Sequence, residues 1–216
     1  MCDPIDDPDL YLRVARENNL SIRYVIDTHL HADHVSGGRR LAEISGAEYV
    51  LHESADTQYA FRRVRDGEKL DLGNVKIEVL HTPGHTPEHI SLLVTDATRG
   101  PEPWFLLTGH TLMVGDVGRT ELATQPEIGA RQLFGTIRRL KEYPEYLEIL
   151  PGAYAGSVCG RALSGKAVST IGFERRFNRA FQIDAVEQFV AFMLENIPVP
   201  PPNAAAVRGL NQGRTG

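Results

Sequence analysis

Short apolar runs alternate with longer amphipathic stretches along the chain. The short runs are rich in β-branched and aliphatic side chains and predict strands at residues 21–27, 47–52, 89–96, 103–109 and 146–152. Two alternating runs within residues 66–84, joined at Leu72-Gly73-Asn74, predict a β-hairpin. Helical spacing of apolar positions is found at residues 8–18, 38–45, 125–143 and 184–196. This alternation indicates an α/β domain built in layers.

The helix expected at 125–143 has an apolar face formed by Ile128, Leu133, Ile137 and Leu140, which are predicted to point inward. The predicted domain covers residues 1–197. The proline-rich stretch that follows, 198–216, then becomes small and polar, so a linker or tail is expected there.

Composition restricts the classes of function. The 216 residues are 42% hydrophobic and 24% charged, as in soluble globular proteins. A formal net charge of -5 argues against nucleic acid or an anionic membrane surface as a partner. No apolar run approaches the ~20 residues of a membrane-spanning helix. The N-terminal residues lack a signal-peptide pattern and two cysteines make no disulfide framework, so a cytoplasmic location is expected.

A dense cluster of histidines and carboxylates follows the strand at 21–27, in the sequence DTHLHADH of residues 27–34. Residues two apart at the end of a strand point to the same side, so His29 and His31 are expected to face one point. Asp33 and His34 follow in the next turn. Imidazole and carboxylate groups at this density suit a metal such as zinc or iron. The alternative is a polar turn with solvated histidines.

A second motif, HTPGHTPEH, covers residues 81–89. Pro83 and Pro87 exclude a continuous helix, because each removes an amide donor and crowds the preceding turn. The segment is therefore expected to be a loop, in which Gly84 allows an unusual backbone angle beside His85. His85 is the expected metal ligand of this loop. The flanking histidines, His81 and His89, are expected to be packed or solvated.

These two motifs, in this order, resemble the metallo-β-lactamase superfamily and, within it, the persulfide dioxygenase and rhodanese-linked branch. The resemblance extends through THLHADHVSGG, HTPGHTPEHIS, TGHTLMVGDVGRTEL, LPGAYAGSVCGRALSG and STIGFERRFN. It implies an αββα sandwich of two mixed β-sheets with helices on both outer faces and a metal at one sheet edge. Family members usually carry an N-terminal β-hairpin ahead of the segment that begins here with CDPIDD, so this chain is expected to lack that hairpin.

The resemblance also implies a ligand set. It gives His29, His31 and His85 to a first metal ion, and Asp33 and His34 to a second.

This sequence departs from the family pattern at two positions. His110 follows Thr108-Gly109, where the family has a metal-binding aspartate, and Ala153 stands where a histidine is usual in the later loop. A carboxylate can bridge two cations, whereas a neutral imidazole offers one lone pair. We therefore expect one metal ion, Fe(II) or Zn(II), on the first three histidines, with His110 completing the set.

Other side chains in the family-like motifs are candidates for catalysis or substrate binding. Asp33, His34 and Asp116 are the expected catalytic residues; for Asp116 the role is an outer carboxylate or, equally, a cap of the turn at 115–118. The expected substrate-binding residues are Arg119, Tyr154 and Arg176, with surface solubility as the alternative for each arginine. Cys159 is a candidate redox group or a small packed side chain.

The resemblance and the expected ligands favour a mononuclear metal enzyme acting on a small sulfur compound, most like a glutathione-persulfide dioxygenase. The alternatives are a zinc-dependent thioester hydrolase of the glyoxalase II type with Asp33 as base, and a catalytically degenerate member. The expected partner is a small, glutathione-like thiol or persulfide, without nucleic acid or membrane. A homodimer or a rhodanese-type partner is a further expectation.

Overall fold

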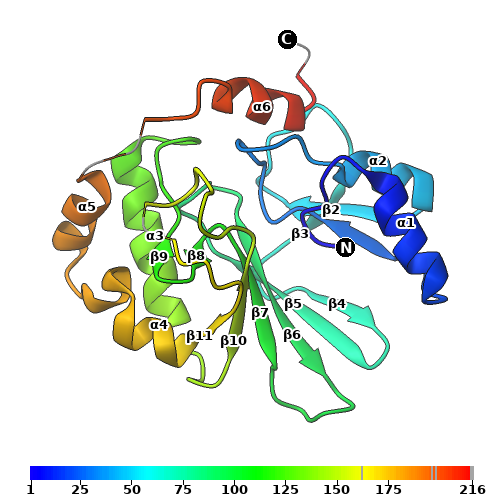
Figure 1. The fold of residues 1–216 in the computed structure, drawn as a ribbon, viewed down its shortest axis with the longest axis horizontal. Coiled ribbons are helices and arrows are strands. Elements are labelled where there is room, and N and C mark those ends of the chain that lie inside the picture. The colour runs from blue at the N-terminus through cyan, green and yellow to red at the C-terminus, as the bar shows by residue number, and fades with distance from the viewer. Residues whose placement is uncertain (162, 196, 198, 215–216) are drawn as a thin grey trace. The chain divides into compact units, whose positions relative to one another are not determined.

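The computed structural model describes residues 1–161, 163–195, 197 and 199–214 and divides into two compact units (Figure 1). Unit 1 comprises Met1–Val64 and Pro201–Gly216, and unit 2 comprises Arg65–Pro200. The predicted ranges 1–197 and 198–216 include residues 162, 196, 198, 215 and 216, which lie outside the described residues. None of the helices in the described ranges is long and apolar enough to cross a membrane.

Unit 1 is built on a parallel sheet with the strand order β1-β2-β3, where β1 is Tyr24–Ile26, β2 is Glu48–His52 and β3 is Arg62–Val64. Two parallel strands need a crossover, and α2 (Gly38–Ser45) supplies it between β1 and β2. Val25, Leu41 and Ala42 form the small core beneath α2, which Tyr11 and Leu12 of α1 (Pro8–Glu17) also contact.

The C-terminal part of unit 1 contains a helix, α6 (Ala204–Asn211), within the range expected to be a linker or tail. Asn211 at its end is 8% exposed and hydrogen-bonds to the backbone of Ser36, in the loop that follows β1. This helix is therefore packed against the N-terminal part of unit 1.

Unit 2 contains a six-stranded sheet with the order β11-β10-β7-β6-β5-β4. The predicted hairpin is confirmed, because β4 (Lys69–Leu72) and β5 (Val75–His81) pair antiparallel with Leu72 opposite Val75. The remaining strands are β6 (Ile90–Asp96), β7 (Phe105–Gly109), β10 (Glu148–Pro151) and β11 (Ser169–Thr170). A separate two-stranded ribbon pairs β8 (Leu112–Met113) with β9 (Asp116–Val117).

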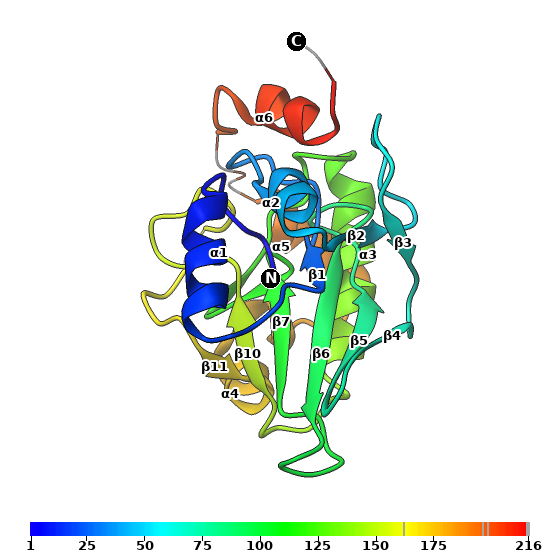
Figure 2. The same cartoon turned by 90° about the vertical axis from the view of Figure 1, so that its right-hand side faces the viewer.

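Helices α3 (Pro126–Leu140) and α5 (Val186–Leu194) cover one face of this sheet, as Figure 2 shows for α3. Between β11 and α5 the chain forms α4 (Ile171–Phe177) and a 3-10 turn, η1 (Arg179–Gln182). Leu80 and Leu106 of the strands pack with Leu133, Ile137 and Phe189 of the helices in the largest core cluster. The predicted α/β class and the helices expected at 8–18, 38–45, 125–143 and 184–196 are confirmed; the second has the expected bounds and the other three are shorter.

The inward face predicted for α3 is wrong at one position. Leu133, Ile137 and Leu140 are buried, but Ile128 is 47% exposed. At 3.6 residues per turn, Ile128 lies about 140° around the helix from Leu133. Gly129 fills the buried side of the first turn instead, where a Cβ atom would come within 2.6 Å of the Thr120 carbonyl oxygen.

Candidate metal centre

The first histidine motif forms the irregular loop between β1 and α2 in unit 1. His29 and His31 are each 1% exposed, and their ring centroids lie 4.1 Å apart. The ring of His34 lies 4.2 Å from that of His31 and is partly exposed, as is Asp33. The loop therefore gathers the histidines that the sequence predicts as ligands within unit 1.

Asp3, which the sequence analysis did not single out, orients both buried histidines. Its Oδ1 accepts a hydrogen bond from the backbone N–H of Thr28 at 2.6 Å and lies 3.1 Å from His31 Nε2. Its Oδ2 accepts from Thr28 Oγ1, which therefore accepts in turn from His29 Nδ1 at 2.9 Å. A metal ion would bind each ring through its other nitrogen, Nε2 of His29 and Nδ1 of His31.

The carboxylate of Asp3 also controls the charge of His31. Burial alone lowers the pKa of His31, but the negative charge of Asp3 and its hydrogen bond outweigh burial and raise that pKa to about 10. A metal ion that binds Nδ1 must displace a proton from this ring.

Asp33 faces the same side of the loop as His31 and His34. Its Oδ1 lies 3.5 Å from His31 Nδ1 and 3.2 Å from His34 Nδ1, and the ligand atoms of the three residues all lie within 4.8 Å of one another. The Asp33 carboxylate is therefore close enough to His31 Nδ1 and His34 Nδ1 to accept a proton there.

In unit 2, His85 lies in the loop after β5, as predicted. Gly84 has φ +142° and approaches α3 so closely that a Cβ atom would lie 2.5 Å from Leu133 Cβ. His85 Nδ1 lies 2.8 Å from the carbonyl oxygen of Arg119. A carbonyl can only accept, so Nδ1 carries the proton and the lone pair of the neutral ring is on Nε2.

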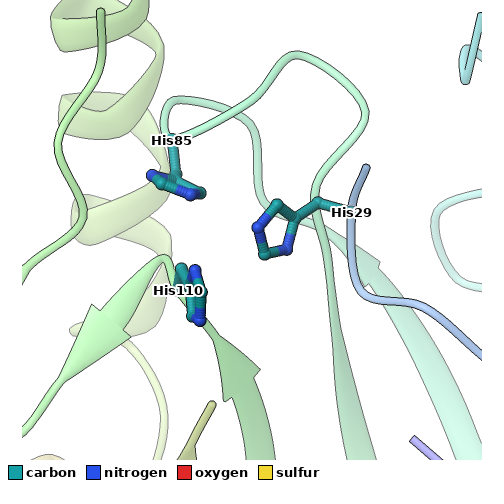
Figure 3. A group of neighbouring side chains, drawn as sticks. All are labelled: His29, His85 and His110. Carbon is teal, nitrogen blue, oxygen red and sulfur yellow. The ribbon is translucent and has the colours of Figure 1, made fainter. Parts of the chain in front are cut away.

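His110 follows β7, and its ring centroid lies 5.3 Å from that of His85 (Figure 3). The turn that carries it is held by His89, which is fully buried, as predicted for a packed histidine. The N–H of His110 donates to His89 Nε2 at 3.1 Å, and His89 Nδ1 lies 2.8 Å from Thr82 Oγ1. A ring nitrogen of His110 and Sγ of the buried Cys159 lie within 4.8 Å of each other.

Two of the other predicted residues organise the backbone of unit 2. Asp116 accepts hydrogen bonds from the backbone N–H groups of Arg161 (2.7 Å) and Val117 (2.9 Å), so it ties the loop after β10 to β9. Arg119 is 3% exposed; its guanidinium pairs with Glu121, and its carbonyl oxygen orients His85. The carboxylate partner of Arg119 lies two residues away, which spacing alone could have suggested.

The remaining two predicted substrate-binding residues lie at the surface of unit 2. Tyr154 is 60% exposed in the loop after β10. Arg176 is exposed on α4, with its guanidinium 5.5 Å from the ring centroid of Phe177.

The donor chemistry of these residues fits a metal ion. In three of the histidines one nitrogen is directed at an oxygen of Thr28, Asp3 or Arg119, and this fixes the tautomer that presents the other nitrogen as a ligand. Imidazole is a good ligand for both zinc and iron. Each unit thus presents imidazole nitrogens that are suited to bind a metal ion.

A family model, that of the metallo-beta-lactamase superfamily, matches residues 3–152, and the chain belongs to this superfamily. A solved metallo-beta-lactamase from Staphylococcus aureus is similar to it at 37% identity with a TM-score of 0.92, covering 98% of this chain and 64% of that chain. ETHE1 from Myxococcus xanthus is similar at 30% identity with a TM-score of 0.80, covering 98% of this chain and 87% of that chain.

Two other relatives bear on chemistry. A hydroxyacylglutathione hydrolase from Prochlorococcus marinus is 30% identical over 141 residues, which are 64% of this chain and 54% of the hydrolase. The chain thus spans about half the length of that relative. TTHA1623, solved in a di-iron-bound form, is 26% identical with a TM-score of 0.60, covering 82% of this chain and 87% of that chain.

Proposed function

We propose that this chain is a metal-dependent enzyme that acts on a small, glutathione-like sulfur compound. In this proposal one Fe(II) or Zn(II) ion binds His29, His31, His85 and His110, so that both units contribute ligands. The observation that carries it is the orientation of the His29, His31 and His85 rings by Thr28, Asp3 and Arg119, which leaves the other nitrogen of each ring as the metal-binding atom.

One bound ion, and not two, is expected because the sequence departs from the family pattern at His110 and Ala153. Two cations a few Å apart need negative charge between them, and a carboxylate supplies it where an imidazole does not. His110 and Ala153 together remove the bridging carboxylate and one further ligand that the resemblance would give a second ion. The di-iron form of TTHA1623 makes the number of bound ions the first quantity to measure.

The chain's own residues would do the following. When bound, the ion supplies Lewis-acid or redox chemistry at open coordination positions. Asp33, whose side chain is 21% exposed, accepts a proton from the substrate or from water, and His34 beside it shares that proton. Arg119 and Asp116 hold His85 and the loop after β10 in place, and the exposed Tyr154 and Arg176 are the candidates for contacting the substrate.

A glutathione-like substrate is supported by the similarity to a hydroxyacylglutathione hydrolase and by the resemblance to the persulfide dioxygenase branch. Two reactions remain candidates. The first is oxygenation of glutathione persulfide, favoured by an all-imidazole set that suits iron and leaves the site positive for an anionic sulfur. The second is thioester hydrolysis, which the hydrolase relative favours equally.

Metal content and two assays separate these reactions. Protein purified without added metal should hold about one equivalent of iron and consume oxygen with glutathione persulfide if it is a dioxygenase. It should hold zinc and cleave a hydroxyacylglutathione if it is a hydrolase.

Variants test the shared ion. His29→Ala in unit 1 and His85→Ala in unit 2 should each lose the same ion, whereas the control His52→Gln, outside both motifs, should keep it. Retention of a full equivalent by both alanine variants would overturn the proposal, and two equivalents in the wild type would overturn the single ion.

A further inference from the structure

We propose that α6 positions the histidine loop of unit 1, with Asn211 as the positioning residue and Arg208 as its support. The contacts are those of unit 1 alone. The inference rests on the proposed function only in that the loop carries His29 and His31.

Asn211 uses its whole side-chain amide on this loop. Nδ2 donates to the carbonyl oxygens of His31 and His34, both at 2.9 Å. Oδ1 accepts the N–H of Ser36 at 2.9 Å. The amide offers two donors and an acceptor, and each has a partner in a segment more than 170 positions earlier in the sequence.

The loop needs such a partner because residues 27–35 form no helix or strand that would satisfy their backbone groups. Asn211 bonds the carbonyls of two histidines that carry predicted ligand or catalytic side chains. Arg208, one turn earlier on α6, donates from Nη1 to the carbonyl oxygen of Leu30 at 2.6 Å. These bonds fix the backbone from which the imidazoles project.

The end of α6 is itself held in place. The hydroxyl of Tyr59 donates to the carbonyl oxygen of Asn211, and the N–H of Gln58 donates to that of Gln212 at 2.8 Å. Because Tyr59 and Gln58 hold the end of α6, the side chain of Asn211 can fix the position of the histidine loop. Aspartate cannot make the same set of bonds because it lacks both donors, and leucine cannot because it lacks all three groups.

The test compares Asn211→Asp with Asn203→Asp, a matched change at an exposed position at the start of the same helix. Two measurements are made on folded protein. Amide hydrogen exchange on metal-free protein reports the loop, and chelator competition with Co(II), together with the Co(II) absorption spectrum, reports the ligands.

In Asn211→Asp we expect amides of residues 29–35 to exchange at least about tenfold faster, Co(II) affinity to fall about tenfold or more, and the Co(II) spectrum to change. Asn203→Asp should match the wild type in all three. Asn211→Leu should also speed exchange at the Ser36 amide, which loses its acceptor.

Unchanged exchange in the loop would overturn the inference, as would faster exchange with unaltered Co(II) affinity and spectrum. If the wild type itself binds no Co(II), the proposed function fails, and loop exchange alone decides the inference. Arg208→Met, which removes the bond to Leu30, is the second variant if changes at Asn211 prevent folding.

Discussion

Asp3 and His31 form a hydrogen-bonded carboxylate–imidazole pair, with 3.1 Å between Oδ1 and Nε2, although 28 positions separate them in the sequence. The same carboxylate reaches His29 through the hydroxyl of Thr28. One acidic side chain therefore orients both histidines of the HxH pair. Such outer partners fix which nitrogen of each ring can bind a metal.

Removing this carboxylate should weaken metal binding without removing a ligand. Asp3→Ala removes the carboxylate beside His31 Nε2 and also the acceptor of the Thr28 backbone N–H. We expect the dissociation constant for Zn(II) to rise by about 10- to 100-fold, measured by chelator competition.

The matched control is Asp6→Ala, which removes a carboxylate that pairs at the surface with Arg40 at 3.4 Å. It should leave the affinity unchanged. Equal affinities for Asp3→Ala and the wild type would show that the pair does not tune the site.

Two substitutions should change the number of metal ions that the protein binds. His110 and the 152–153 segment are neighbours, since a Cβ atom on Gly152 would lie 3.2 Å from His110 Cδ2. The double variant His110→Asp, Ala153→His restores the two groups that the family pattern usually has. We expect about two zinc equivalents in the double variant and about one in the wild type, measured by elemental analysis after gel filtration.

The single variant His110→Asp isolates the carboxylate and should stay near one equivalent, because it still lacks the histidine. Two equivalents in the wild type would refute the charge argument on which the single ion rests.

The sequence predicts those parts of the site that local pattern determines. HxHxDH after a strand and two prolines around His85 are local signals, and the structure places these residues in the expected loops. Asp3, Asn211 and the Arg119 carbonyl could not be predicted, because each acts through a contact distant in sequence. Nothing in the spacing of residues indicates which distant backbone or carboxyl group will meet an imidazole.

In the fold, too, the elements with a clear local pattern were predicted and those without one were not. Strands with alternating or continuous apolar runs were predicted, whereas the short β3, β8, β9 and β11 were missed because two or three residues carry no period. α6 was missed because its small and polar residues, following three prolines, are typical of a linker. Tertiary hydrogen bonds from Arg208 and Asn211 to the loop after β1 hold this helix in place.

Stability measurements on α3 can test the corrected face directly. Leu133 is fully buried next to Gly84, whereas Ile128 is about half exposed. Leu133→Ala should cost about 2–5 kcal/mol in the free energy of unfolding, because it leaves a cavity. Ile128→Ala should change the free energy of unfolding by no more than about 0.5 kcal/mol, because its side chain is already about half exposed to water.

Chemical denaturation of both variants measures this difference. Similar losses for the two variants would mean that the helix packs with a different face toward the core.

The ion pair between Asp66 and Arg139 gives a pH-dependent contribution to stability. Burial raises the pKa of Asp66. Hydrogen bonds from Arg139 and from the His81 N–H, both at 2.7 Å, and the positive charge of Arg139 outweigh burial, so the pKa of Asp66 lies below its ordinary value. A carboxyl group whose folded pKa is depressed stabilises the protein above its unfolded pKa of about 3.9. That contribution is lost as the pH falls through the folded value.

Asp66→Asn should therefore lower the free energy of unfolding at pH 7 by about 0.2–1 kcal/mol, a small effect because the pair is solvent-exposed. The difference from the wild type should shrink as the pH falls below about 4. It should also shrink in 1 M salt, which screens the pair over about 3 Å. Urea denaturation across this pH range measures the effect, and a difference that grew toward low pH would reverse the sign and refute the assignment.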